Sequence, residues 1–505
     1  MPRVPLDRRT VLAGLAAGST ALCFPRAWSA DASASPSGIA HDPLRPEYHL
    51  LPPHNWMNDP NGPIWWKGRY HLFYQLNPHA AVWGDMHWGH AASPDMVHWQ
   101  HQPIALAPTP GGADSEGCFS GSAVVNNGVP TFIYTGVQNA RPDRVTLHDG
   151  SDKLRETQML ATSEEDDLLH WKKLETPVIA SPPAGVTVTG FRDPCPWRED
   201  DGWYLGIGSG ERGRGGCVLL YRSQDLRHWE YLHKLAEGKP NGKVAVNPCD
   251  SGEMWECPDF FALNGHHCLF YSTEGKVLWS TGSYDMHAHR FKAQHEGILD
   301  HGAYYAPKSF PAPDGRRILW GWIQETRPQA EYAAAGWAGV MSLPRVLTVD
   351  SKGQLEINPA AEVKSLRGPV EHVKLTPQNP WRAHLTTLRH ELSIPISLSA
   401  RAVSVRLFTA GAQVWELTID VAANAIHCGE ETFPLPSLPW ARPSLDLFLD
   451  GSVIESFIGG REALTSRVYE VKPGATEVEV AITGPHTIAL SHWPLAVISP
   501  DLLTA

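Results

Sequence analysis

Five short aromatic runs recur along the first two thirds of this 505-residue chain. They are residues 70–74 (YHLFY), 131–134 (TFIY), 203–207 (WYLGI), 267–271 (HCLFY) and 317–322 (RILWGW). A second pattern, in which a turn precedes a tryptophan, repeats between them at 93–99 (SPDMVHW), 169–171 (LHW) and 223–229 (SQDLRHW). Tandem units this rich in β-forming residues indicate an array of similar sheets. We therefore predict an all-β fold in which residues 41–360 form a five-bladed β-propeller.

A short polar motif lies about ten residues before each aromatic run. The five motifs are 56–62 (WMNDPNG), 119–122 (FSGS), 191–194 (FRDP), 255–259 (WECPD) and 304–307 (YYAP). If each aromatic run is the second strand of a blade, each motif lies at the first strand, which lines the propeller axis. Residues far apart in the chain are therefore expected to meet in one funnel.

The pattern changes after residue 360. A polar, proline-containing segment, 361–378, is expected to be a linker. It is followed by alternating apolar and polar stretches such as 403–408 (VSVRLF), 414–419 (VWELTI) and 445–449 (LDLFL). Short strands with this period predict a C-terminal β-sandwich over residues 379–500, which we expect to cover the flank of the propeller.

The charge balance limits the classes of partner. With 42 basic and 54 acidic residues the net charge is −12, which disfavours binding to nucleic acid or to an anionic membrane surface. The 20 tryptophans suit an aromatic cleft that stacks on sugar faces. We therefore expect a neutral small-molecule or oligosaccharide substrate.

The first 34 residues resemble an export signal rather than part of the fold. Arg8 and Arg9 precede an apolar stretch, 11–24, and small residues follow it as far as Ala34. This order predicts a twin-arginine signal peptide with its processing region, and a periplasmic or secreted protein. The competing interpretation is a short buried helix that follows a chance arginine pair.

Three carboxylates occupy unusual settings within the polar motifs. Asp59 lies in Asn-Asp-Pro-Asn-Gly, Asp193 lies between Arg192 and a proline, and Glu256 lies between a tryptophan and a cysteine. Each has an ordinary reading as a turn residue, an ion pair or a buried polar group. Their joint placement at equivalent repeat positions favours a catalytic cluster, because glycosidic bond cleavage uses paired carboxyl groups. We expect apolar surroundings to keep Glu256 protonated, and Arg192 to keep Asp193 ionised.

The motifs 56–62, 191–194 and 255–258 resemble the three hallmark motifs of glycoside hydrolase family 32, the invertase, inulinase and levanase family. The similarity also includes residues 82–84 (VWG), 88–91 (WGHA), 119–122 (FSGS), 320–322 (WGW) and 336–339 (GWAG), and it extends into the predicted sandwich at 453–457 (VIESF). The resemblance implies a retaining β-fructosidase that removes terminal fructose from sucrose or fructans.

The resemblance also implies roles for individual residues. Asp59 would be the nucleophile, Glu256 the acid and base, and Asp193 the stabiliser of the transition state. The substrate-binding residues would be Asn58, Gln75, Trp83, Phe119, Ser120, Arg192 and Asp300. No metal or organic cofactor is expected, because histidine-rich pieces such as 87–90 and 266–267 show no ligand set.

One departure from the family pattern affects the leaving-group side. The family often has a charged residue at or beside position 303, where this chain has Ala303, with Asp300 three positions earlier. This weakens a strict invertase assignment and leaves fructan exohydrolase open. The motifs are also compatible with a fructosyltransferase, a fructan-binding propeller without activity, or a related five-bladed inverting hydrolase.

Overall fold

The computed structural model describes residues 36–141, 144–397, 400–436, 440 and 443–503. Strands dominate this part of the chain, so the prediction of an all-β protein is confirmed. The predicted signal peptide, residues 1–34, lies outside the described residues. Within them, no helix combines the length and the apolar character needed to cross a bilayer.

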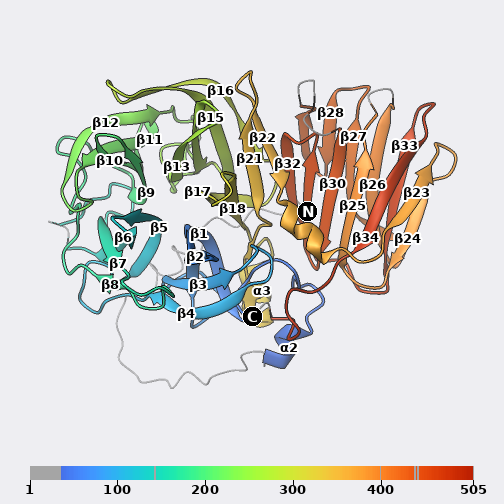
Figure 1. The fold of residues 1–505 in the computed structure, drawn as a ribbon, viewed down its shortest axis with the longest axis horizontal. Helices are drawn as coiled ribbons and strands as arrows, with labels where there is room; N and C mark the ends of the chain where they lie inside the picture. Colours follow the sequence, from blue (N-terminus) through green and yellow to red (C-terminus); the bar gives the residue numbers. More distant parts are fainter. Residues whose placement is uncertain (1–35, 142–143, 398–399, 437–439, 441–442, 504–505) are drawn as a thin grey trace.

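The first two thirds of the chain form five antiparallel sheets that follow one another in sequence order (Figure 1). Sheet 1 contains β1 (Asn55–Trp66), β2 (Arg69–Asn77), β3 (His87–Ser93) and β4 (Gln100–Leu106). Sheet 2 contains β5 (Gly117–Asn126), β6 (Val129–Asn139), β7 (Leu154–Thr162) and β8 (Lys172–Lys173). Sheet 3 contains β9 (Phe191–Glu199), β10 (Gly202–Glu211), β11 (Gly215–Ser223) and β12 (Trp229–Glu237).

Sheets 4 and 5 complete this series. Sheet 4 contains β13 (Glu256–Leu263), β14 (His266–Thr273), β15 (Lys276–Asp285) and β16 (Arg290–Asp300). Sheet 5 contains β17 (Tyr304–Pro311), β18 (Arg317–Ile323), β20 (Val340–Met341), β21 (Arg345–Val349) and β22 (Leu355–Pro359). Helix α2 (Pro36–Ala40) precedes the series, and α3 (Gln329–Ala335) leads from β18 to β19 (Trp337–Ala338), which pairs in parallel with β1. The end of the series is thus tied back to sheet 1.

The first strands of the five sheets contact one another in a closed order. Strand β1 contacts β5, β5 contacts β9, β9 contacts β13, β13 contacts β17, and β17 contacts β1. Each of these strands contains one of the five polar motifs, and the five aromatic runs lie in the second strands β2, β6, β10, β14 and β18. The motifs therefore meet on one set of neighbouring strands, as the repeat predicted.

Each first strand is interrupted by a β-bulge at its polar motif. The register against the second strand shifts between Met57 and Pro60 in β1, and between Phe119 and Gly121 in β5. Equivalent shifts occur at 192–195 in β9, at 256–259 in β13 and at 305–308 in β17. A bulge leaves a residue unpaired and turns its side chain out of the regular alternation. The fold thus provides five irregular positions side by side.

Two further antiparallel sheets form the C-terminal part of the chain (Figure 1). One has the order β23 (Glu371–Leu375), β34 (Ile488–Pro494), β25 (Arg389–Pro395), β30 (Ser444–Asp450), β31 (Val453–Ile458) and β32 (Glu462–Arg467). The other has the order β24 (Trp381–Leu385), β33 (Thr476–Thr483), β26 (Ala402–Thr409), β27 (Ala412–Asp420), β28 (Ala425–Cys428) and β29 (Glu431–Pro434).

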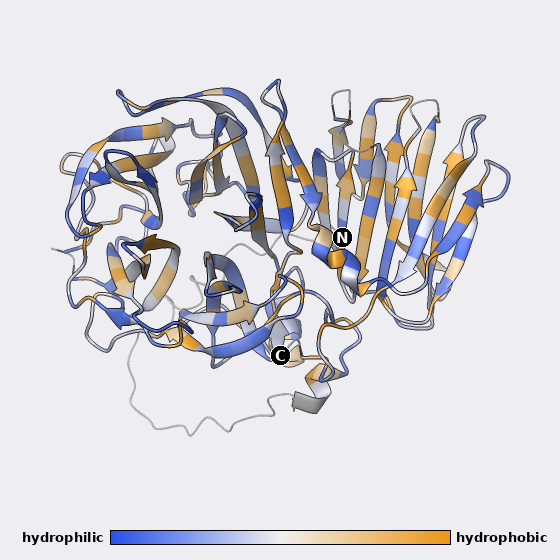
Figure 2. Ribbon diagram, in the orientation of Figure 1, coloured by the Kyte–Doolittle hydropathy of each residue, from blue (hydrophilic) through white to orange (hydrophobic). Residues whose placement is uncertain are grey.

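Both C-terminal sheets contribute alternate residues to one apolar core, which Figure 2 shows as bands of opposite hydropathy along the strands. The segment 361–378, expected to be a linker, contains the 3-10 helix η1 (Ala361–Leu366) and strand β23, which pairs with β34. The predicted linker therefore extends too far, because the short and mostly polar sequence of β23 (EHVKL) does not show the alternation typical of a strand.

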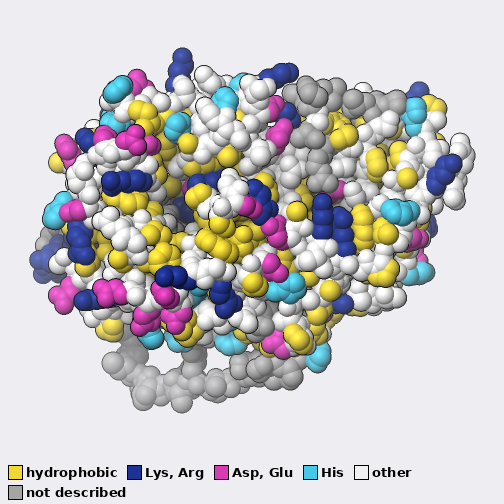
Figure 3. All heavy atoms as spheres, viewed as in Figure 1, with side chains coloured by type: hydrophobic (Ala, Val, Ile, Leu, Met, Phe, Trp, Pro, Cys, Tyr) yellow, Lys and Arg dark blue, Asp and Glu magenta, His cyan; other side chains and the backbone are white. Residues whose placement is uncertain are grey.

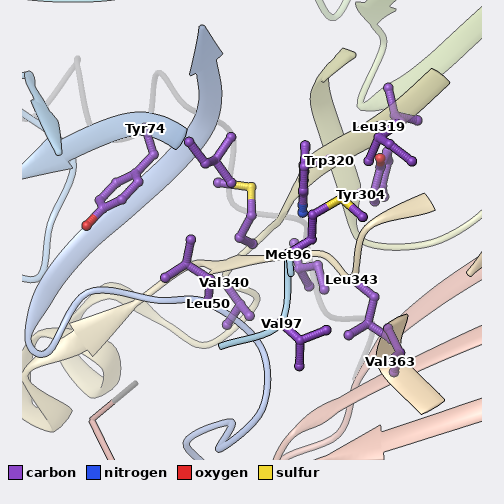
Figure 4. Close-up of a cluster of buried hydrophobic side chains, with 14 of the residues drawn as sticks. Leu50, Tyr74, Met96, Val97, Tyr304, Leu319, Trp320, Val340, Leu343 and Val363 are labelled. Atoms are coloured by element: carbon purple, nitrogen blue, oxygen red, sulfur yellow. The ribbon is translucent and has the colours of Figure 1, made fainter. Parts of the chain in front are cut away.

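A shared apolar cluster joins the C-terminal sheets to the five-sheet series. Figure 4 shows part of it, with Leu50, Met96, Trp320 and Leu343 converging from distant segments. The same cluster continues to Phe448 and Phe457 of the C-terminal sheets. The two parts of the chain are therefore packed on a common core rather than held by a tether alone.

A buried network of charges lies at the same junction. Arg345 of β21 contacts Glu455 of β31 at 2.5 Å and Asp300, the last residue of β16, at 2.9 Å. His49 contacts Glu455 at 3.0 Å and Asp450 at 2.8 Å through its two ring nitrogens. Burial opposes a charge on His49, but its hydrogen bonds to Asp450 and Glu455 outweigh this and raise its pKa to about 9.

Removing the cation of this network should destabilise the fold strongly. We expect Arg345→Met to cost about 3–5 kcal/mol, because Glu455 and Asp300 would keep buried charges without their main partner. The measurement is the midpoint of urea denaturation. Lys67→Met is the matched control, because Lys67 forms an exposed pair with Asp166 at 3.0 Å that is worth less than about 1 kcal/mol. Equal losses in the two variants would contradict the assigned importance of the buried network.

Candidate active site

Asp59 lies in the bulge of β1 and is fully buried. Ser120 of β5 donates a hydrogen bond to its Oδ2 at 2.6 Å, and the amide of Asn58 donates one to its Oδ1 at 2.9 Å. Asn58 is itself held by the indole N–H of Trp56, 2.8 Å from its Oδ1. The carboxylate of Asp59 is thus fixed by donors from two neighbouring sheets.

Asp193 lies in the bulge of β9 with a left-handed backbone, at a φ of 63°. The backbone N–H of Cys257 donates to its Oδ2 at 2.9 Å. The thiol of Cys257 lies 3.4 Å from the same oxygen and 3.5 Å from Oδ2 of Asp59. One residue of β13 therefore touches both aspartates, and it is the neighbour of Glu256.

The environment of Asp193 raises its pKa to about 6. Burial is the main cause, and the charges of Glu256 and Asp59 add to it, whereas Arg192 and the Cys257 N–H act in the opposite direction. Arg192 lowers this pKa, as expected, but burial and the two other carboxylates outweigh it, so the net shift of the pKa is upward. Sequence proximity showed the arginine but not the two carboxylates from other sheets.

Glu256 is buried at the start of β13. The guanidinium of Arg192 donates two hydrogen bonds to its Oε1, at 2.9 and 3.1 Å, and the hydroxyl of Tyr305 donates one to its Oε2 at 2.9 Å. The apolar surroundings expected from its neighbours are therefore incomplete. Trp255 points to the other face of the strand, where it stacks on Tyr271 at 3.7 Å between ring centres.

Glu156 is a part of the site that the sequence analysis missed. It lies in β7, fully buried, and its Oε1 accepts a hydrogen bond from Arg192 at 3.0 Å while its Oε2 accepts one from the backbone N–H of Phe191 at 2.6 Å. Arg192 is thus shared between Glu156 and Glu256. Burial opposes its charge, but these two carboxylates outweigh burial and raise its pKa. The sequence feature that could have indicated it is an acidic residue within a strand whose other residues are mostly buried.

Tyr305 and Cys257 were also missed as site residues, although both belong to motifs that the sequence analysis singled out. Tyr305 directly precedes the bulge of β17, and Cys257 lies within the bulge of β13. The contact of Tyr305 with Glu256 is visible only once β17 lies beside β13. The contacts of Cys257 with the two aspartates join β13 to β1 and β9.

The remaining predicted residues lie around this cluster with one exception. Gln75 of β2 faces the bulge of β1, and its amide donates to the backbone oxygen of Cys118 at 2.9 Å. Trp83 and Phe119 form an edge-to-face pair with ring centres 5.8 Å apart. Both rings are only partly buried, so they can supply an apolar wall.

Asp300 is the exception, and its predicted direct contact with substrate is corrected. Its carboxylate is fully buried and accepts hydrogen bonds from the backbone N–H and hydroxyl of Thr465, at 2.9 and 2.7 Å, and from the N–H of Gly302 at 2.9 Å. Arg345 neutralises it. Asp300 therefore orders the turn that carries Gly302 and Ala303 rather than pointing into the cavity.

A cavity of about 680 Å³ reaches the cluster at Glu256, whereas the buried Asp59 and Asp193 are not among its lining residues. Glu256, Tyr305, Trp56, Trp83 and Trp322 line one part of it. Its other lining residues include Lys243, Asp250, Glu274, Lys276, Ala303, Glu325 and Glu431. Acidic groups outnumber lysines in this wall, but Glu256 and Glu325 are paired with arginines that do not line it, so the acidic excess is small.

The C-terminal sheets take part in this cavity. Glu431 of β29 contacts Lys276 of β15 at 3.1 Å, and both line the wall. His301 stacks on Phe433 of β29, with ring centres 3.6 Å apart, and it contacts Glu462 of β32 at 3.0 Å. Charged side chains of both signs are interspersed over the face of the molecule in Figure 3.

A second cavity of about 540 Å³ lies further along the first strands, where Cys195, Asp259 and Lys308 are among its lining residues. None of the predicted site residues lines it. Within the described residues one group of histidine and acidic side chains could hold a metal ion, His79, Asp85 and His87, and it does not include the three carboxylates.

Comparison with known protein families gives two matches that together cover most of the chain. Residues 49–359 match the glycosyl hydrolases family 32 N-terminal domain, and residues 366–493 match the glycosyl hydrolases family 32 C-terminal domain. A sucrose-6-phosphate hydrolase of Escherichia coli is 38% identical over 89% of this chain and 94% of its own length. A raffinose invertase of Escherichia coli is 36% identical over 88% of this chain and 93% of its own length.

Solved structures give the same result. A β-fructofuranosidase of Bombyx mori in complex with sucrose superimposes with a TM-score of 0.78 at 30% identity, covering 92% of this chain and 96% of that one. A fructan 1-exohydrolase of Cichorium intybus in complex with 1-kestose has a TM-score of 0.73 at 28% identity, covering 90% and 98%. The resemblance inferred from the motifs is confirmed, and the chain belongs to glycosyl hydrolase family 32.

Proposed function

We propose that this protein is a retaining β-fructosidase, which hydrolyses terminal β-D-fructofuranosyl linkages in sucrose or fructans by double displacement. The observation that carries the proposal is the single cluster formed by Asp59, Asp193 and Glu256. Cys257 touches both aspartates and adjoins the glutamate. Three carboxylates from three sheets converge beside a cavity with tryptophan in its wall.

In the first step Asp59 attacks C2 of the fructosyl unit as the bond from C2 to the glycosidic oxygen breaks. Asn58 and Ser120 hold the attacking carboxylate in place. Glu256 gives its proton to the departing oxygen, so the leaving sugar is released as a neutral alcohol. The product of this step is a covalent ester between C2 and Asp59.

In the second step water replaces Asp59 at C2. Glu256, now ionised and hydrogen-bonded by Arg192 and Tyr305, takes the proton of the water. Positive charge develops on the fructosyl ring in both steps, and the ionised form of Asp193 stabilises it. Trp83 and Phe119 exclude water from the sugar face.

The architecture that supports this site is, in our proposal, a five-bladed β-propeller over residues 41–360 followed by a β-sandwich over residues 379–500. The support for it is the closed order of contacts among β1, β5, β9, β13 and β17. The shared core of the two C-terminal sheets supports the second part.

For the leaving group, we propose a neutral sugar, the glucose of sucrose or the remainder of a fructan. Relatives are named both for sucrose 6-phosphate and for raffinose or fructan substrates. The small acidic excess in the cavity wall opposes a phosphorylated sugar, and Lys276 is already paired with Glu431. Export by the twin-arginine route remains a proposal that rests on Arg8 and Arg9, and cell fractionation tests it.

Changes to the two reacting carboxylates should abolish turnover. We expect Asp59→Asn and Glu256→Gln each to lower kcat for sucrose by about 10³-fold or more while the protein stays folded. Glu164→Gln, the same change at an exposed position, should leave kcat unaltered. Circular dichroism checks the fold, and NMR of the first fructose released checks its anomeric form. Release of the inverted anomer, or near-normal turnover by both variants, would refute the proposal.

The pH profile should report the carboxylate cluster. Since the pKa of Asp193 is raised to about 6, kcat/KM should fall as the pH drops through about 6, where Asp193 becomes protonated. Arg192→Gln removes a charge that lowers this pKa, so the acid limb should move to higher pH and kcat should fall. Arg382→Gln, in the C-terminal sheets and mostly exposed, is the control. An acid limb that stays in place in Arg192→Gln would contradict this assignment.

Glu431 should affect the choice of leaving group. Glu431→Gln leaves the Lys276 cation without its partner and removes a negative charge from the cavity wall. The ratio of kcat/KM for sucrose 6-phosphate to that for sucrose should rise by about three- to fivefold, as for a half-exposed ion pair. The control is Glu416→Gln, whose partner Arg406 lies in β26. An unchanged or lower ratio would show that Glu431 does not shape this part of the cavity.

A further inference from the structure

The segment between β2 and β3, residues 78–86, carries Trp83 toward the cavity. Its base is held by Asn77, whose amide donates to the backbone oxygen of Val82 at 2.9 Å and whose Oδ1 accepts the N–H of His79 at 2.9 Å. Trp83 packs edge-on against Phe119. The position of this ring thus depends on a short segment with few internal hydrogen bonds in the described structure.

Three potential metal ligands lie on both sides of Trp83: His79 and Asp85 within the segment, and His87 directly after it. The side chains of His79, Asp85 and His87 bring one ligand atom each to within 4.8 Å of one another. Nε2 of His79 lies 3.2 Å from Oδ2 of Asp85. His79 and Asp85 are exposed, so small side-chain rotations can shorten the remaining separations, whereas His87 is buried and fixed.

The hydrogen bonding of His87 prepares it for a metal. Its Nδ1 lies 2.7 Å from the backbone oxygen of Asp85, which can only accept, so Nδ1 carries the proton. The lone pair of Nε2 is then available. A histidine that donates one ring N–H to a carbonyl while the other nitrogen binds an ion is the usual arrangement in metal sites.

We propose that His79, Asp85 and His87 bind a divalent transition-metal ion of the Zn²⁺ class, and that the bound ion holds Trp83 in its position at the cavity. Two imidazoles and a carboxylate with a water in the fourth position match the tetrahedral preference of Zn²⁺. The ion takes no part in the reaction. No metal was expected from the sequence, because only histidine-rich pieces such as 87–90 and 266–267 were weighed as ligands, and not the spacing His-x5-Asp-x-His.

The first test is metal binding, which does not depend on the proposed function. The full-length protein is freed of metal with a chelator, and Zn²⁺ is titrated in by isothermal calorimetry. We expect one ion per chain, and at least about tenfold weaker binding in His79→Ala and in His87→Ala. His79 is exposed, so its variant should fold even if the His87 variant does not.

The matched control for binding is His98→Ala. His98 and Asp95 form an exposed pair at 2.8 Å, but within the described residues this pair belongs to no group of three candidate ligands. Binding in this variant should equal that of the unmodified protein. Absence of a one-to-one site, or equal binding in His79→Ala, would overturn the metal site.

The second test concerns Trp83, and this part rests on the proposed function. Because the ion would hold the ring in the conformation seen here, Zn²⁺ should lower KM for sucrose by about threefold with little change in kcat. His79→Ala should show the same KM with and without Zn²⁺. Binding without a change in KM would overturn the link to Trp83, whereas a protein that binds Zn²⁺ but cleaves no fructoside would instead refute the proposed function.

Discussion

The site depends on a β-bulge at the same place in five neighbouring strands. A regular strand would alternate its side chains between two faces, and Asp59 and Asp193 could not then meet Cys257. Asp193, Cys257 and Ala306 have left-handed backbones, each of which costs about 1 kcal/mol or more. A proline follows each of them and also follows Asp59. Proline has no N–H that the irregular ladder would leave unpaired. The proline of each motif therefore suits the bulge that the same motif forms.

The distribution of charge in the site follows from these positions. Arg192 is shared by Glu156 and Glu256, while Asp59 and Asp193 are held by neutral donors: a hydroxyl, an amide, a thiol and a backbone N–H. The cluster therefore has more carboxylates than cations. An excess of carboxylate favours a reaction whose transition state gains positive charge on the sugar, and it disfavours an anionic leaving group.

The sequence was sufficient to predict the all-β class and the convergence of the motifs, because each motif has a fixed offset from an aromatic strand. The family followed from the resemblance of the motifs themselves to known family motifs. The sequence was not sufficient for the partners of individual groups. Asp300 was expected in the cavity, but its partner Thr465 lies 165 residues further along the chain. Glu156 was missed because it belongs to the site only through its hydrogen bond with Arg192, which reaches it from the next sheet. Local pattern sets which residues face the centre, while packing between distant segments decides their protonation and their neighbours.

The C-terminal sheets do more than cover a flank, which was the role expected for them. Thr465 of β32 fixes the Asp300 carboxylate and so the turn that carries Ala303, and Phe433 stacks on His301 in the same turn. Glu431 reaches the cavity wall itself. Trp83, which flanks the fructosyl unit in the proposed mechanism, lines the same cavity. In the proposed mechanism the first strands supply the groups that act on the fructosyl unit, and the contacts between the two parts of the chain shape another part of the same cavity.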